Sequence, residues 1–283
     1  MFSYSLLKTH RVGSYLSECS ITWEQARKVV SLLRDISLRD VLEVEKVDPQ
    51  YISTAAICAS KGIDGAISVF LAALAAYQLR CSGEEYWRRF AEHYVREVGV
   101  EDPIEKVSSF ILKDSCSSFL RDVKVARVKK FTSYLGRVSE LISSCNFHQL
   151  WHLTARVLNS DSESKTVVFA VKMGYYSGRA LELCRDPLPM DIPIPVDSRV
   201  GKASLNLGLV SARSVEEAIS KCRRQIVAVW RHIGEMLKIP PIHLDTLIWA
   251  LQNSETMSSA LTRVSTKQAA EALLRFQRAI LSR

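Results

Sequence analysis

The sequence contains little glycine and proline, 11 and 8 of its 283 residues, and none of the glycine-rich loops that hold phosphate groups. It has no Walker phosphate-binding loop, no G-x-G-x-x-G fingerprint and no G-x-S-x-G nucleophile motif. These absences argue against nucleotide-cofactor enzymes and α/β-hydrolases. Alternating runs of β-branched residues are also scarce, whereas helical spacing of apolar residues recurs along the chain, so we expect an all-α protein.

Cysteine shows no clustered motif, because its seven residues are scattered without a C-x-x-C pair. An odd number of scattered cysteines favours a reducing, cytoplasmic compartment and mostly buried free thiols. No residue pattern follows the last cysteine that could hold an iron–sulfur cluster, so no metal site is expected. The seven are Cys19, Cys58, Cys81, Cys116, Cys145, Cys184 and Cys222.

Long apolar runs are also missing. The first residues, MFSYSLLKTHRVGSYLSEC, have no sustained apolar core and no small-residue cleavage pattern, so we expect neither a signal peptide nor an anchor. The most apolar segment, Gly65 to Leu79, is shorter than the roughly 20 residues that span a bilayer. It is therefore expected to be a buried core helix, and no contact with a membrane is predicted.

Positive charge is in excess, with a formal net charge of +8. A cationic surface releases counterions when it binds a phosphate backbone, so a nucleic acid is a plausible partner. The most basic segment, Phe119 to Ser144, has the spacing of one long helix. It is either a phosphate-facing surface or a solvated face, and the sequence leaves both open.

One stretch, Lys165 to Asp197, suggests a chemistry. The polar turn NSDSES joins two helical patterns into a hairpin, with Ser162 or Ser164 as the cap of the second helix. Lys165 then lies in a first turn, where the positive potential of the helix end disfavours an ammonium and favours a nucleophilic amine. After the extended segment DPLPMDIPIP, Asp197 is placed to cap the next helix.

A second pattern, HQLWH, places His148 and His152 four residues apart on a helix, the spacing of two zinc ligands. Gln149 occupies the position where a zinc protease has its glutamate base, and no third ligand is evident. Ordinary core or surface histidines are the better interpretation.

Several motifs together resemble one family. KTVVFAVK, DIPIPVDSRV and PPIHLDTLIW, with DPQY and GEEYW upstream, are similar to the archaeal 8-oxoguanine DNA glycosylase/AP lyase family AGOG, a branch of the helix-hairpin-helix glycosylases. The resemblance runs from about Leu38 to Trp249. It implies an all-α fold with two helical subdomains flanking an active-site cleft. One subdomain is expected to combine residues 1–60 with 200–283, and the other to comprise 61–199 with the hairpin.

The resemblance also implies roles for individual residues. Lys165 matches the Schiff-base nucleophile that attacks the sugar C1′, and Asp197 matches the aspartate that assists it; a simple helix cap is the alternative for Asp197. Further residues match the pocket of the extruded base, and two of them, the aromatic pair Trp87 and Phe169, would otherwise be interpreted as core residues. For Lys172 the alternative is an ion pair with a neighbouring aspartate. The expected pocket residues are Gln50, Trp87, Phe169, Lys172, Asp245 and Trp249.

The hairpin departs from the wider superfamily, because NSDSES has no glycine and contains two acids, Asp161 and Glu163. The predicted function is excision of 8-oxoguanine through a lysine–sugar imine, followed by β-elimination of the strand, by a monomer without metal or organic cofactor. Two alternatives stay open: a non-catalytic helical DNA-binding protein, and a glycosylase for another damaged purine.

Overall fold

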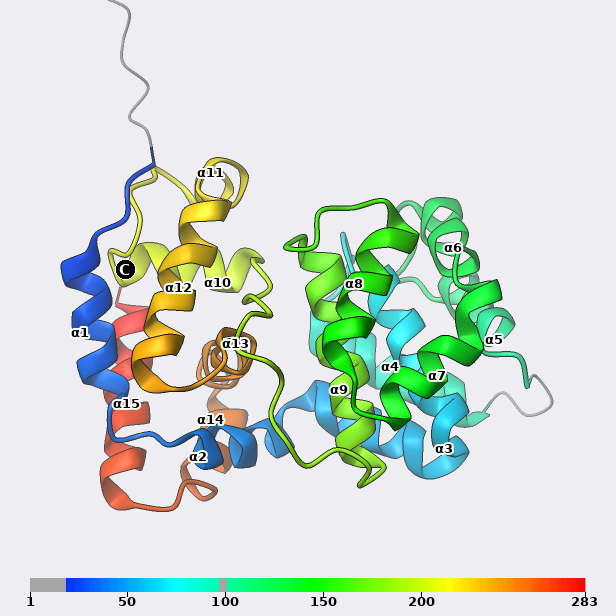
Figure 1. Cartoon of the computed structure of the whole chain (residues 1–283), viewed down its shortest axis with the longest axis horizontal. Helices are drawn as coiled ribbons and strands as arrows, with labels where there is room; N and C mark the ends of the chain where they lie inside the picture. Colours follow the sequence, from blue (N-terminus) through cyan, green and yellow to red (C-terminus); the bar gives the residue numbers. More distant parts are fainter. Residues whose placement is uncertain (1–18, 97–100, 283) are drawn as a thin grey trace, which may run out of the picture.

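The computed structural model describes residues 19–96 and 101–282, so a prediction about the first eighteen residues lies outside the described part. Within it the chain forms helices and a single bridge between Ile21 and Val210, with no strand, which confirms the all-α prediction. Figure 1 shows two helical bodies side by side. Two backbone segments join them, one at each end of the central part of the chain.

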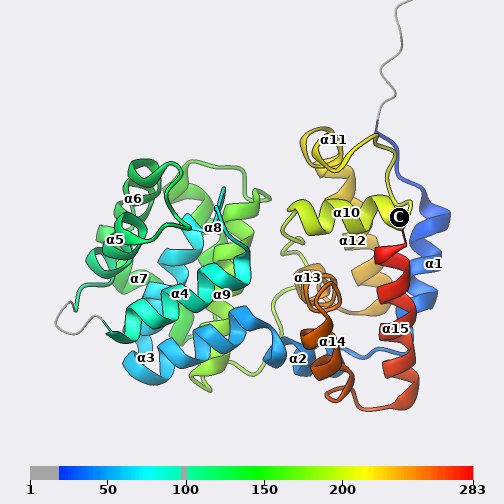
Figure 2. The same cartoon turned by 180° about the vertical axis from the view of Figure 1, so that it is seen from behind.

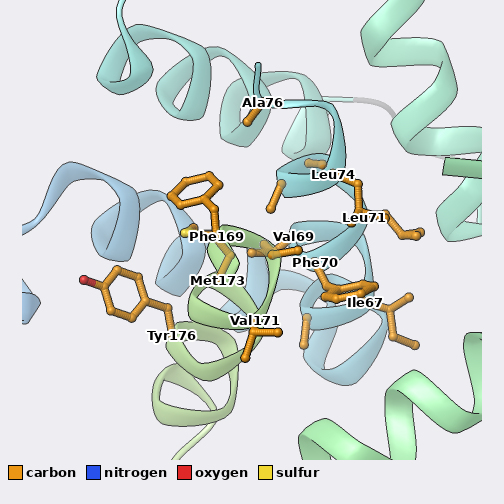
Figure 3. Close-up of a cluster of buried hydrophobic side chains, with 14 of the residues drawn as sticks. Ile67, Val69, Phe70, Leu71, Leu74, Ala76, Phe169, Val171, Met173 and Tyr176 are labelled. Atoms are coloured by element: carbon orange, nitrogen blue, oxygen red, sulfur yellow. The ribbon is translucent and has the colours of Figure 1, made fainter. Parts of the chain in front are cut away.

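One body, here called the central body, is built around a core of buried residues from Ile57 to Ile192, which Ile242 also joins. Its two innermost helices are α3 and α9, and Figure 3 shows Val171 of α9 beside apolar side chains of α3 such as Ile67 and Phe70. The helices of this body are α3 (Pro49–Ala75), α4 (Gly83–Arg96), α5 (Pro103–Lys113), α6 (Arg121–Lys129), η2 (Thr132–Tyr134), α7 (Leu135–Ser143), α8 (Phe147–Leu158) and α9 (Lys165–Ala180).

The second, the terminal body, buries apolar residues from both chain ends in a separate core that includes Ala26 to Val44 and Ile194 to Ile280. The first and last helices lie side by side in it, as Figure 2 shows. Its helices are α1 (Trp23–Leu33), α2 (Leu38–Val44), η1 (Glu45–Val47), α10 (Ser198–Asn206), α11 (Val215–Lys221), α12 (Arg223–Leu237), α13 (Pro241–Ala250), α14 (Ser254–Leu261) and α15 (Lys267–Leu281).

Helix α3 enters the central body and begins as its sequence predicts. Asp48 caps it by accepting a hydrogen bond from the backbone N–H of Gln50, and Pro49 is its first residue. A kink at Gly62, with φ +55° and ψ −129°, divides the helix next to the expected domain boundary at residue 60. The later half, from Gly65 to Ala75, is buried. By length and composition alone α3 could span a membrane, but two thirds of its most apolar window is covered by the protein.

The basic segment Phe119 to Ser144 is not one helix, so that prediction is wrong. It forms α6 and α7, separated by the short turn η2. Phe131 is buried against Phe70, with ring centroids 5.3 Å apart, and the Thr132 hydroxyl donates to the Lys129 carbonyl. Burying this aromatic ring turns the chain, and the hydroxyl takes a carbonyl that would otherwise continue the helix.

The expectation of free thiols is also wrong for six of the seven cysteines. Only Cys58 is free and buried among the described residues, and the others form three disulfides. The sequence pattern could not reveal them, because the partners are 35 to 203 residues apart and only the fold brings their Cα atoms within 5.2 to 5.6 Å. The pairs are Cys19–Cys222, Cys81–Cys116 and Cys145–Cys184.

Candidate active site

A cavity of about 280 Å³ lies between the two bodies, with walls from α3, α4 and α9 on one side and α10 and α13 on the other. Side chains that are up to 199 positions apart in the sequence therefore meet in one place. Of the eight residues named from the sequence, Lys172 does not line this cavity. The other seven do: Gln50, Trp87, Lys165, Phe169, Asp197, Asp245 and Trp249.

Lys165 is the first residue of α9, as predicted. Ser164 precedes it with an extended backbone but does not cap the helix, because its hydroxyl bonds to that of Ser160 instead. The N–H groups of the first turn of α9 are therefore not neutralised by a capping side chain. Their positive potential acts at the wall of the cavity, where Lys165 is partly exposed.

Asp197 is carried to the same cavity by the segment that crosses between the bodies. Ile192 belongs to the core of the central body, whereas Ile194 and Val196 belong to that of the terminal body. Asp197 follows as the cap of α10, and its Oδ1 accepts from the N–H groups of Arg199 and Val200 at 2.9 and 3.0 Å. Both bonds end on Oδ1, so the second oxygen is not used by the cap.

Two aromatic rings form one end of the cavity. Trp87 of α4 and Phe169 of α9 are 1% and 7% exposed, and their ring centroids lie 6.2 Å apart with an interplanar angle of 58°. Both are thus core residues and cavity walls at once. A flat base stacked between them needs parallel rings about 7 Å apart, which is twice a stacking distance of roughly 3.5 Å. The two rings must therefore turn and separate slightly to hold one.

Two residues of the cavity wall each carry a buried acceptor without a partner among the described residues, Gln50 Oε1 and Asp245 Oδ1. Both side chains are 1% exposed. Leaving a buried acceptor unsatisfied costs about 1–3 kcal/mol, and such an atom at a cavity wall indicates a ligand that donates to it.

Lys172 lies beneath the cavity and is paired with Asp245, which was the alternative raised for it. Its Nζ is 2.5 Å from Asp245 Oδ2, and both side chains are 1% exposed. Burial would lower the pKa of the Lys172 ammonium, but the carboxylates of Asp245 and Asp48 raise it above its usual value. Burial raises the pKa of Asp245 to about 6, although Lys172 works in the opposite direction.

A buried polar network continues from this pair towards the start of α3. The Tyr176 hydroxyl donates to Asp48 Oδ2 at 3.1 Å and lies 3.0 Å from the Thr246 hydroxyl. The Lys172 ammonium is 5.3 Å from the centroid of the Tyr176 ring. Asp48 also caps the helix that carries Gln50. The network therefore connects the two residues with unpartnered acceptors, Gln50 and Asp245.

Sequence reasoning missed Arg199, which also lines the cavity. Its guanidinium carbon is 3.5 Å from the centroid of the Trp249 ring, and it forms an ion pair with Glu84. A Cβ on Gly83 would be 2.8 Å from Cη2 of the same indole, so any larger residue at position 83 would displace the Trp249 ring. The signal available in the sequence was the position of Arg199, two residues after the capping aspartate.

The two histidines of HQLWH lie away from this cavity. His148 Nε2 is 3.0 Å from Asp191 Oδ2, and the rings of His148 and His152 have centroids 4.5 Å apart. Within residues 19–96 and 101–282, no three His, Cys, Asp or Glu side chains are grouped so that they could hold a metal ion.

Comparison with known proteins gives a consistent result. The model of the AGOG family, described as N-glycosylase/DNA lyase, matches residues 30–279. An N-glycosylase/DNA lyase of Aeropyrum pernix is 31% identical over 240 residues, 81% of this chain and 83% of the relative. That of Methanopyrus kandleri is 32% identical over 226 residues, 78% and 87% of the two chains.

Among solved structures, the chain is similar to that of the 8-oxoguanine DNA glycosylase Pa-AGOG from Pyrobaculum aerophilum, determined in complex with 8-oxoguanosine. The TM-score is 0.77 at 24% identity, and the match covers 89% of this chain and 96% of the other. The likeness confirms the predicted glycosylase fold.

Proposed function

The chain belongs to the AGOG family of N-glycosylase/DNA lyases, and from that premise we propose that it excises 8-oxoguanine from DNA and then cleaves the strand. One observation carries the proposal. A single cavity combines Lys165 and Asp197 with two aromatic walls and two buried acceptors that lack donors. These are the parts that a base-flipping enzyme needs.

In the proposed reaction, the neutral amine of Lys165 attacks C1′ of the extruded nucleotide. The bond between C1′ and N9 breaks, and its electron pair leaves with the base, which takes up a proton. Asp197 accepts a proton from the attacking amine and stabilises the positive charge that develops on the sugar. Its place as the cap of α10 fixes the carboxylate through two backbone N–H groups.

The lyase step follows from the same covalent bond. Opening of the bond between C1′ and O4′ converts the adduct into a protonated imine, which acidifies the protons at C2′. Loss of one of these protons and cleavage of the C3′–O bond release the 3′ phosphate group with the electron pair. Hydrolysis of the imine then returns the Lys165 amine.

Base recognition would use the two unpartnered acceptors. 8-Oxoguanine has an N7–H donor where guanine has an acceptor, and it carries further donors at N1 and N2. Gln50 Oε1 is our candidate for the N7–H, and Asp245 Oδ1 then faces the other donor edge. A pocket built on acceptors rejects a base that lacks the matching donor, because the acceptor stays buried and unpaired.

Borohydride trapping tests the covalent step. Sodium borohydride reduces the imine, so the wild-type protein should become covalently attached to a duplex containing 8-oxoguanine, at Lys165. Lys165→Gln should abolish the adduct, whereas Lys202→Gln is a matched control, because Lys202 is an exposed lysine of the neighbouring helix α10. Trapping by Lys165→Gln would overturn the assignment of the nucleophile.

Asp197→Asn should bind the same duplex but lose most of its excision activity. Excision near the wild-type rate would remove the proposed role of this carboxylate. The alternatives predict other outcomes: a non-catalytic DNA-binding protein binds without any adduct or strand cleavage, and a glycosylase for another lesion traps a different oligonucleotide in a panel of damaged purines. Action on chromosomal DNA inside the cell, by a monomer, is part of the proposal.

A further inference from the structure

Besides the buried pairs Lys172–Asp245 and Arg179–Glu45, three partly exposed ion pairs connect the two bodies. Glu84 of α4 pairs with Arg199 of α10, with the Oε1 and guanidinium nitrogen atoms 2.5 Å apart. In the α8–α9 hairpin, Asp161 pairs with Arg223 and Glu163 with Arg231, both arginines of α12. In each of these three exposed pairs the acid belongs to the central body and the arginine to the terminal body. The hairpin acids, whose purpose the sequence did not explain, are therefore partners of cations across the cleft.

These pairs lie close to the residues proposed to act on the sugar. Asp161 and Glu163 stand four and two positions before Lys165 in the hairpin, and Arg199 follows Asp197 by two. A sugar whose C1′ is within reach of Lys165 carries a phosphodiester group on each side. Those two phosphates lie outside the base cavity, beside the residues that precede Lys165 and follow Asp197. Arg199 lines the cavity itself, and Arg223 and Arg231 contact the hairpin that leads to Lys165.

The arginines are suited to exchange one anion for another. A guanidinium group binds phosphate and carboxylate oxygens through the same planar set of donors. The three side chains are 24%, 29% and 40% exposed for Arg199, Arg223 and Arg231, and ion pairs at such exposure are weak. Arg231 also keeps one donor, Nε, buried without a hydrogen-bond partner among the described residues.

We propose that Arg199, Arg223 and Arg231 bind the phosphodiester groups beside the extruded nucleotide, and that the three acids hold these arginines in position until DNA displaces them. The inference rests on the proposed function only in taking DNA as the substrate. It assigns the glycine-free hairpin a role as a competitor for phosphate-binding arginines. The stack of Arg199 on Trp249 orients its guanidinium at the cavity wall during the exchange.

The test is the salt dependence of binding to an undamaged duplex, measured by fluorescence anisotropy in a series of KCl concentrations. Arg223→Gln and Arg231→Gln should each weaken binding about five- to tenfold near 0.1 M salt and reduce the slope of log K against log salt by about one, because each loses one phosphate contact. Arg275→Gln is the matched control, since this arginine pairs with Asp35 on the terminal body.

The acids should have the opposite effect. The double variant Asp161→Asn with Glu163→Gln should bind the duplex several-fold more tightly, whereas Asp35→Asn should leave the affinity near that of the wild type. Arg223→Lys keeps the charge and should therefore keep most of the salt dependence that Arg223→Gln loses. A variant that binds weakly because it is misfolded is identified separately, by its circular dichroism spectrum.

Two results would overturn the proposal: arginine variants that behave like Arg275→Gln, or a hairpin double variant whose affinity is unchanged or lower. Either result would mean that the ion pairs only hold the two bodies together and do not compete with DNA. Failure of the borohydride trap with these salt slopes intact would instead remove the glycosylase proposal and leave the phosphate-binding arginines in place.

Discussion

Breaking the buried Lys172–Asp245 pair on one side should destabilise the protein by about 3–5 kcal/mol, because the remaining charge is left in the interior without its partner. The structure sets the scale: both side chains are 1% exposed and their charged atoms are 2.5 Å apart. Asp245→Leu is expected at the upper end of this range. Asp245→Asn should cost less, because its amide oxygen can still accept a hydrogen bond from Lys172.

Removing both charges separates stability from recognition. The double variant Lys172→Met with Asp245→Leu replaces the pair by apolar side chains of similar size, so it should recover most of the loss. Binding of 8-oxoguanosine should not recover, because the Asp245 Oδ1 acceptor at the cavity wall is gone. Denaturant unfolding measures the first quantity, and equilibrium binding of the nucleoside measures the second.

Three results would refute this reasoning. If Asp245→Leu unfolds at the wild-type denaturant concentration, the pair does not hold a desolvated charge. If the double variant is no more stable than the single variants, the loss does not come from an unpaired charge. If the double variant binds the nucleoside as tightly as the wild type, Asp245 takes no part in recognition.

Other features give independent predictions. Breaking the Cys81–Cys116 disulfide by Cys116→Ser should cost about 4 kcal/mol, from a sequence separation of 35 residues, and a melting temperature indifferent to reductant would contradict this. Since burial raises the pKa of Asp245 to about 6, nucleoside affinity should fall as the pH drops below 6 and this acceptor protonates, and Asp245→Asn should flatten the profile. Phe169→Leu should weaken base binding by about 1–3 kcal/mol, unlike Phe110→Leu in the core of the same body.

Features that depend on a few adjacent residues were predictable from the sequence. The caps formed by Asp48 and Asp197 are examples, because a carboxylate followed by free N–H groups is a local arrangement that needs no tertiary contact. The position of Lys165 at the start of α9 follows in the same way from the polar turn before it. Their meeting in one cavity was suggested only by the family resemblance, since no local rule brings these helix ends together.

Features that depend on tertiary contacts were not predictable. Lys172 and Asp245 are 73 residues apart, and nothing near either residue reveals the other. The same holds for the disulfides, whose scattered cysteines look like free thiols until the fold pairs them. The break in the basic segment likewise depends on Phe131 packing against Phe70, a contact that helical spacing alone does not show.

The two lysines of α9, Lys165 and Lys172, require opposite electrostatic surroundings. They are seven residues, or about two turns, apart, and so lie on the same side of the helix. Lys172 is buried and needs a carboxylate beside it, whereas a nucleophile needs an amine that no acid holds as an ammonium ion. Within the described residues no ion pair to Lys165 occurs, although two acids stand just before it in the hairpin. Those acids are paired with arginines of the opposite body, so in the DNA-free protein neither of them forms an ion pair with Lys165.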